Sequence, residues 1–342
     1  MLSAVRPWEG SIKASSCRRS LTTTPLLETS QSRRGVVFFN DKGLGPSELR
    51  LIQRVGQVMD HPQEASFYRS TISAKKDAHL GIVEQDDPEI LIISSESQKE
   101  SFPDSLPGAT RKFASWGWHS DESQDKYPPA YSGSKIAKSP PTGGDMLFVS
   151  SYGLYDHLSE PWQKFAESLT ATHFAEEYFM IRDSGVPFED WARGQPENIG
   201  FEFKESHPVV RTNPVTGWKG LFGEGFGLVN GWYDNMTEHE SNLVKQYFLD
   251  VIAHSSDLQI RRSWRDNGAA IWNNAAVHHN PTYDVVEGER LIPCHWHWRE
   301  ALFRPEVHQH GRVSSRVSTK MAVKLCFTSA ALLPSRTSKA ST

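Results

Sequence analysis

Cysteine is scarce in this sequence, and long apolar runs are missing. The three cysteines in 342 residues, Cys17, Cys294 and Cys326, lie far apart and form no CxxC pair. Neither a disulfide framework nor a cysteine-based zinc site is therefore expected, and the spacing is typical of a protein in a reducing compartment. No stretch approaches the roughly 20 apolar residues that a membrane-spanning helix needs. The sequence predicts a chain without membrane contact.

Acidic residues are nearly absent from both ends of the chain. Residues 1–35 hold six Lys/Arg and two acids, and residues 307–342 hold six Lys/Arg and no acid. The remaining 25 bases and 39 acids lie between 36 and 306, which gives this middle part a formal charge of -14. Because phosphate backbones attract basic surfaces, an acidic core argues against nucleic acid as a partner.

The same distribution predicts three regions. Residues 1–34 form a basic leader rich in Ser and Arg, which is either disordered or a targeting segment. Residues 35–305 are long enough for one catalytic domain, and residues 306–342 form a basic tail without periodicity that we expect to be disordered. A cytoplasmic location is expected, with a mitochondrial one as the alternative if the leader is a transit peptide. The sequence leaves open whether the chain forms a homo-oligomer.

Short apolar segments separated by Pro and Gly predict a mainly β fold with flanking helices. Strands are expected at Gly35–Phe39 and Ile90–Ile93 and through the stretch from Trp116 to Ser150. Helices are expected over Ser47–Met59, from near Ser159 onward, and over Thr237–His254. The last of these begins with a capping-box pattern and carries an apolar stripe that includes Leu243, Val244, Phe248 and Ile252.

Two further strands are expected in the second half of the chain. Leu258–Trp264 and Ala269–Trp272 flank the turn residues Asp266, Asn267 and Gly268. Two apolar runs around such a turn predict a β-hairpin.

His119 and Asp121 form an HxD pair within the predicted β region. Residues two apart on a strand project from the same face, so the imidazole and the carboxylate can reach one ion. A second histidine from elsewhere would complete a triad of two histidines and one carboxylate, which is typical of ferrous iron and leaves coordination positions open.

An ordered set of motifs follows this pair. A Pro-rich stretch at Tyr127–Tyr131 precedes Pro140–Phe148, which contains a TGGD turn. The later motifs are HPVVRTNP at 207–214, TGWKGLF at 216–222, QIRRSW at 259–264 and IWNN at 271–274. Over about residues 35 to 290 the sequence resembles the taurine dioxygenase/TfdA-like family. The resemblance implies a double-stranded β-helix (jelly-roll) core, Fe(II), 2-oxoglutarate as co-substrate and O2.

The activity that the resemblance implies is hydroxylation of a small organic molecule, with release of succinate and CO2. The substrate would be a sulfonate, another organic acid or a secondary metabolite. Two alternatives from other classes are a zinc-dependent hydrolase that uses the same ligands and a catalytically altered family member that acts as a binding protein.

The resemblance also implies roles for single residues. The distal iron ligand is His278 or His279, and the spacing to Asp284 favours His279. The family arginine that binds 2-oxoglutarate lies eleven positions after that histidine, where this chain has Arg290. Arginine suits this role because its planar fork makes a bidentate pair with a carboxylate. Thr142, in the TGGD turn, is expected to donate a second hydrogen bond to the same carboxylate.

The sequence departs from the family pattern near these residues. Met146 replaces a threonine, and Asn273 and Asn274 are followed by two alanines in place of the usual Asp-Asn-Arg. Cys294 stands where family members that act on sulfonates or carboxylates often have a second arginine, and Arg299 is the nearest candidate to replace it. The iron and co-substrate half of the site therefore matches the family, while the substrate half diverges.

Overall fold

The computed structural model describes residues 11–12, 35–39, 91–95, 117–176, 178–179, 183, 192–213, 216–282, 284–285 and 287–298, with the side chains of 11–12, 91–92, 94, 226 and 293–298 excepted. The chain divides into two compact units, Met1–Arg304 and Pro305–Thr342, and all described residues belong to the first. The expected helix at Ser47–Met59 lies outside the described residues.

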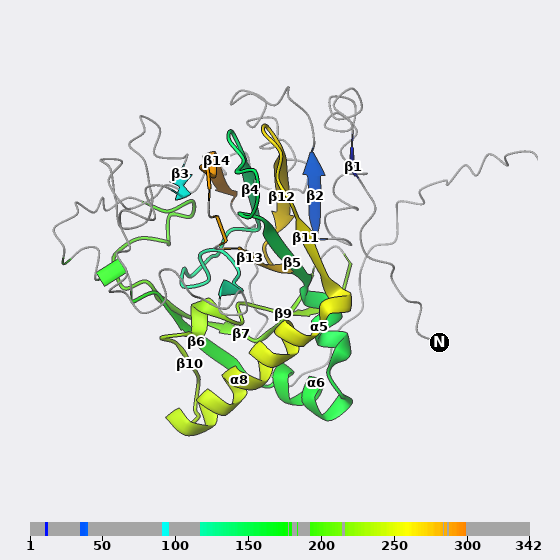
Figure 1. Ribbon diagram of the computed structural model, residues 1–342. Helices are drawn as coiled ribbons and strands as arrows, with labels where there is room; N and C mark the ends of the chain where they lie inside the picture. Colours follow the sequence, from blue (N-terminus) through cyan, green and yellow to red (C-terminus); the bar gives the residue numbers. More distant parts are fainter. Residues whose placement is uncertain are drawn as a thin grey trace, which may run out of the picture. The chain divides into compact units, whose positions relative to one another are not determined.

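Strands dominate the described part of the chain, as the sequence predicts (Figure 1). The largest sheet has the order β1-β2-β12-β4-β14-β3, and a three-stranded sheet has the order β11-β5-β13. A second three-stranded sheet has the order β10-β6-β7, and β8 pairs with β9. The strand bounds are β1 Ser11–Ile12, β2 Val36–Phe39, β3 Leu91–Ser94, β4 Tyr131–Lys135, β5 Met146–Ser150, β6 Thr170–Phe174, β7 Lys204–Pro208, β8 Val210–Thr212, β9 Lys219–Leu221, β10 Trp232–Tyr233, β11 Gln259–Arg262, β12 Ala269–Asn273, β13 Val277–Pro281 and β14 Leu291–Trp298.

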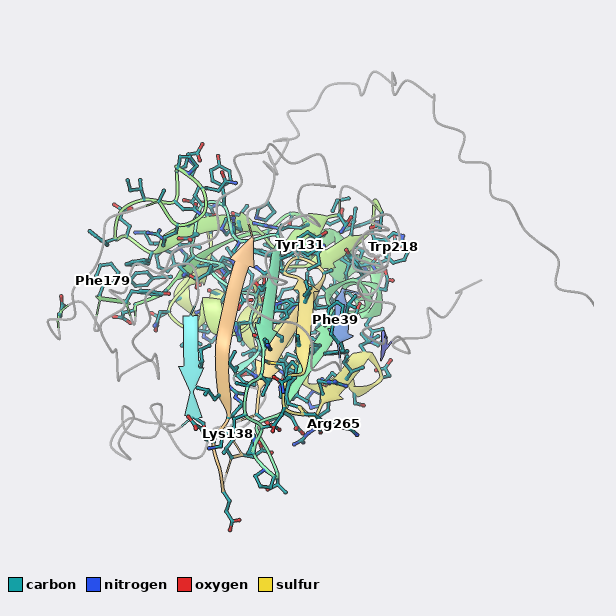
Figure 2. The ribbon with its side chains drawn as sticks, turned by 90° about the horizontal axis from the view of Figure 1, so that it is seen from above. Phe39, Tyr131, Lys138, Phe179, Trp218 and Arg265 are labelled. Carbon is teal, nitrogen blue, oxygen red and sulfur yellow. The ribbon has the colours of Figure 1, made fainter. Side chains whose placement is uncertain are left out.

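The buried strand β12 lies near the middle of the largest sheet. It pairs antiparallel with β2 on one side and with β4 on the other, and all five of its residues are buried. Figure 2 shows β2, β12, β4, β14 and β3 side by side, with Tyr131 at one end of this sheet and Lys138 at the other. Trp272 of β12 packs edge-on against Phe148 of β5, at 5.6 Å between ring centroids. This contact joins the largest sheet to the sheet that contains β13.

The α-helices whose bounds lie within the described residues are α5 Ser151–His157, α6 Glu160–Glu167 and α8 Glu238–His254. The predicted start of α6 is confirmed, with Ser159 at the N-cap and a proline in the first turn. The capping box of α8 is also confirmed, because Thr237 and Glu240 bond reciprocally. Short 3-10 turns lie at Phe226–Leu228 and Ser256–Leu258. Figure 1 shows α8 running alongside α5 and α6.

The inward face of α8 is narrower than the sequence predicts. Val244, Phe248 and Ile252, four residues apart, are buried in a core shared with α5, α6 and β6. Leu243 was expected in the same stripe but is 59% exposed. The prediction was wrong at this residue, since Leu243 lies one position round the helix from the buried row.

The expected hairpin between β11 and β12 is also wrong. β11 pairs with β5, whereas β12 pairs with β2 and β4 in another sheet. The connecting turn bonds elsewhere: Asn267 N–H donates to the Ile136 carbonyl, and Ile136 N–H donates to the Gly268 carbonyl. The turn residues were predicted correctly. However, β12 pairs on both edges with β2 and β4 and not with β11, its neighbour in sequence, and in this position all five of its residues are buried.

Within the described residues, no helix is long and apolar enough to cross a membrane.

The orientation of α8 generates a matched pair of predictions. Phe248→Ala should lower the free energy of unfolding by about 3–5 kcal/mol, because the ring is fully buried and its loss leaves a cavity. Leu243→Ala, on the same helix, should change it by about 0.5 kcal/mol or less, since that side chain is mostly exposed. Denaturant unfolding of both variants measures the difference. Equal losses would contradict the described orientation of α8.

Candidate metal centre

Two segments 160 residues apart in sequence meet at His119 and His279. Each residue donates its backbone N–H to the carbonyl of the other, at 3.0 Å in both directions. The two imidazole rings lie 4.1 Å apart between centroids. Asp121 joins them, and one ligand atom from each of the three residues lies within 4.8 Å of the others. The HxD pair and the distal histidine expected from the sequence are therefore brought together.

Asp121 reaches the two histidines from a turn. His119 forms only an isolated β-bridge, and the chain turns at Asp121, with a positive φ of 48° at Glu122. The expectation that both residues project from one extended strand was therefore wrong, although the side chains do converge. Asp121 Oδ1 lies 3.5 Å from His119 Nε2 and 3.3 Å from His279 Nε2.

Trp272 and Asn274 fix the position of Asp121. Trp272 Nε1 donates to Asp121 Oδ2 at 3.2 Å, which leaves Oδ1 toward the histidines. The Asn274 side chain accepts from the Asp121 N–H at 2.7 Å and donates to the Asp121 carbonyl at 2.8 Å. Asn274 is fully buried, so this amide pairing replaces a strand partner for the turn. Both residues belong to the IWNN motif at 271–274, but nothing in that motif indicates this role.

The histidine rings are oriented for Nε2 to serve as the ligand atom. His119 Nδ1 lies 2.7 Å from the Gly117 carbonyl, an arrangement that holds the proton on Nδ1 and leaves Nε2 for a metal. Burial opposes the charged form of His119, but the hydrogen bond and charge of Asp121 outweigh it and raise the pKa of His119. Burial lowers the pKa of His279, and Asp121 only partly opposes this. Two imidazoles and one carboxylate in this arrangement fit a divalent transition metal.

His278 faces away from this cluster. Successive strand residues point to opposite faces, and His278 Nδ1 lies 3.0 Å from Ser151 Oγ while its Nε2 accepts from the Glu224 backbone N–H at 3.2 Å. Burial lowers the pKa of His278 to about 3, so this ring is neutral. The geometry thus groups His279, and not His278, with His119 and Asp121.

Glu224 is a buried acid that the sequence analysis missed. Tyr233 OH donates to its carboxylate at 2.6 Å, and burial raises the pKa of Glu224 to about 8. It lies behind His278, on the opposite face of β13 from His279. The only signal in the sequence is a lone acid within the apolar, Gly-rich run from Gly220 to Leu228.

Arg290 and Thr142 lie around the Gly143–Gly144 turn, which precedes β5. Arg290 is buried, and its Nη1 donates to the Gly144 carbonyl over a long 3.4 Å. Thr142 is exposed at the edge of the same turn. This turn connects to the histidine cluster through the β5–β13 ladder, in which Phe148 pairs with His279 and Met146 pairs with Pro281. Arg290 therefore has a buried setting beside the turn, whereas Thr142 has none.

Several known proteins are similar in sequence to most of this chain. The alpha-ketoglutarate-dependent dioxygenase oryG of Aspergillus oryzae is 36% identical over 260 residues, which cover 74% of this chain and 72% of oryG. The alpha-ketoglutarate-dependent dioxygenase btcD of Neocamarosporium betae is 34% identical over 297 residues, covering 82% and 81% of the two chains. An alpha-ketoglutarate-dependent sulfonate dioxygenase of Saccharomyces cerevisiae is 29% identical over 219 residues, which cover 62% of this chain and 47% of the yeast protein.

Solved structures share the fold at lower identity. The crystal structure of a taurine dioxygenase from Burkholderia xenovorans is 20% identical, with a TM-score of 0.56 over 82% of this chain and 81% of that one. The family model described as "Taurine catabolism dioxygenase TauD, TfdA family" matches residues 18–297. With this match and with the relatives above, the resemblance noted from the motifs is confirmed, and the chain belongs to the TauD/TfdA family of dioxygenases.

Proposed function

We propose that this chain is an Fe(II)- and 2-oxoglutarate-dependent dioxygenase that hydroxylates a small organic molecule. The observation that carries the proposal is the convergence of His119, Asp121 and His279 in a member of this family. Relatives with the names alpha-ketoglutarate-dependent dioxygenase and sulfonate dioxygenase support the reaction class. We further propose that the sheets with β5, β13 and β12 build the double-stranded β-helix expected from the sequence.

The three residues would hold ferrous iron through His119 Nε2, His279 Nε2 and Asp121 Oδ1. Three protein ligands would leave coordination positions of the ion open for co-substrate and dioxygen. When bound, ferrous iron allows O2 to decarboxylate 2-oxoglutarate oxidatively, so that one oxygen atom enters succinate and the other enters the substrate. The protein residues supply the positioning: Trp272 and Asn274 hold Asp121 in place, and Gly117 fixes the His119 ring.

Arg290 is the proposed partner of the distal carboxylate of 2-oxoglutarate. It is buried, and a guanidinium in a desolvated setting binds a carboxylate through strong charge-assisted hydrogen bonds. Thr142 is proposed as a second donor from the resemblance alone, since its side chain is exposed.

The substrate is proposed to be a small organic molecule that lacks a strongly acidic group. Cys294 stands where family members that act on sulfonates or carboxylates often have a second arginine, and a cysteine there offers such groups no positive charge. Substrate-stimulated succinate release should therefore be stronger with uncharged metabolites than with alkyl sulfonates or aryloxy acids. Stimulation by sulfonates alone would contradict this part of the proposal.

The two adjacent histidines provide a test of the iron assignment. Fe(II) and 2-oxoglutarate, added anaerobically, should give a visible metal-to-ligand charge-transfer band with the wild-type protein. His279→Ala should abolish the band, because it removes one of three protein ligands. His278→Gln should keep it, since His278 bonds to Ser151 and Glu224 on the opposite face. Loss of the band in His278→Gln and its retention in His279→Ala would reverse the assignment.

The role of Arg290 predicts weaker co-substrate binding on substitution. Arg290→Ala should raise the Kd for 2-oxoglutarate by about tenfold to a hundredfold, the effect of losing a hydrogen-bonded charge partner. Titration of the same visible band with 2-oxoglutarate measures the Kd, and Fe(II) binding provides the control because it should stay unchanged. An unchanged Kd for 2-oxoglutarate would exclude Arg290 as the carboxylate partner.

A further inference from the structure

Arg261, on β11, forms a double ion pair with two acids from other segments. Its Nε donates to Asp145 Oδ2, and its Nη2 donates to Asp284 Oδ2 at 3.1 Å. Asp145 directly follows the Gly143–Gly144 turn, and Asp284 lies in the segment between β13 and Arg290. The guanidinium thus connects the turn that contacts Arg290 with the segment that precedes Arg290 in the chain.

Asp284 also bonds directly to the Gly143–Gly144 turn. Its Oδ1 accepts from the Gly144 N–H at 2.9 Å. The backbone also approaches closely, because a Cβ built on Gly143 would lie 2.2 Å from the Asp284 carbonyl oxygen. Both glycines have positive φ, 77° at Gly143 and 65° at Gly144, which side chains disfavour. Only glycine at these two positions lets the turn dock on the Asp284 segment.

Arg290 packs on the other side of the same turn. A Cβ on Gly144 would lie 3.1 Å from Arg290 Cδ, and the Gly144 carbonyl accepts from Arg290 Nη1. The Asp145 carbonyl is held as well, by the backbone N–H and the hydroxyl of Thr282 at 2.8 and 3.2 Å. The turn is therefore fixed between the Arg261 ion pairs and the Arg290 side chain.

Arg261 is too exposed for its ion pairs to contribute much to the stability of the whole fold, so a positioning role can be tested apart from a stabilising one. Its side chain is 54% exposed, and ion pairs at such sites contribute little to the stability of the whole fold. The effect on the packing of the turn is different. Removing the guanidinium leaves Asp145 and Asp284 as two neighbouring carboxylates, on segments that must stay packed together. Repulsion between them would loosen the turn on which Arg290 rests.

We propose that Arg261 is a positioning residue for the co-substrate: by pairing with Asp145 and Asp284 it holds the Gly143–Gly144 turn against Arg290. This inference rests on the proposed function, in which Arg290 binds the distal carboxylate of 2-oxoglutarate. Arg261 itself does not contact the co-substrate in this account.

The test is the affinity of Arg261→Ala for 2-oxoglutarate, measured by anaerobic titration of the visible Fe(II) band. The Kd should rise about twofold to fivefold, the range expected for the loss of a partly exposed ion pair. The Fe(II) affinity, the melting temperature and kcat at saturating 2-oxoglutarate should stay close to wild type. Arg261→Lys should recover part of the affinity, because one ammonium can replace a charge but not the fork that spans two acids.

Two further variants provide matched controls. Asp284→Asn keeps an oxygen that accepts from the Gly144 N–H but loses the charge, so it should raise the Kd too, and should not add to Arg261→Ala. Arg265→Ala removes the same charge from a residue in the turn before β12, where the Arg265 carbonyl accepts from the Gly268 N–H. It should leave the Kd unchanged. An equal rise in Arg265→Ala would reveal a general charge effect and overturn the proposal.

The outcomes also separate this inference from the function on which it rests. If Arg290→Ala weakens 2-oxoglutarate binding and Arg261→Ala does not, the positioning role is wrong while the function stands. A parallel loss of Fe(II) affinity and thermal stability in Arg261→Ala would overturn it as well, since the residue would then act on the whole fold. If Arg290→Ala binds 2-oxoglutarate as the wild type does, the carboxylate assignment fails and the inference fails with it.

Discussion

The reciprocal backbone pairing of His119 with His279 is the constraint on which the site depends. It joins the segment before β4 to β13 at one point, with two hydrogen bonds of 3.0 Å, and so sets the separation of the two imidazoles. Asp121 can then complete the cluster from a turn, because Trp272 and Asn274 hold its carboxylate and its backbone. The same β13 strand sends His278 to the opposite face, where Ser151 and Glu224 keep it buried and neutral.

The β5–β13 ladder connects this pairing to the proposed co-substrate site. β13 pairs with β5, and β5 follows directly on the Gly143–Gly144 turn. The chain after β13 returns past that turn before it reaches Arg290, and the close approach is possible only because the turn has no side chains. One ladder therefore connects the histidine cluster to the arginine, so that the proposed iron and carboxylate positions share one rigid support.

The sequence predicts the chemistry of the site better than it predicts the local structure around it. His119 and Asp121 stand out by their HxD spacing, while His279 and Arg290 were expected from the order of motifs that resemble the family pattern. The path of the chain at Asp121 was not predictable, because the turn is stabilised by Asn274, 153 residues away. The sheet partner of β11 was missed for the same reason: a local pattern identifies a strand and a turn, but pairing is decided by burial of β12 on both edges.

The central claim is that His119, Asp121 and His279 hold one ferrous ion that also chelates 2-oxoglutarate. A crystal structure of the anaerobic complex with Fe(II) and 2-oxoglutarate, with anomalous data collected at the iron edge, tests this most directly. The account predicts one iron peak bonded to Nε2 of both histidines and to the Asp121 carboxylate, with the co-substrate chelating the ion and its distal carboxylate on Arg290. Iron bound elsewhere, ligation through His278, or a closed site that leaves 2-oxoglutarate unbound would contradict it.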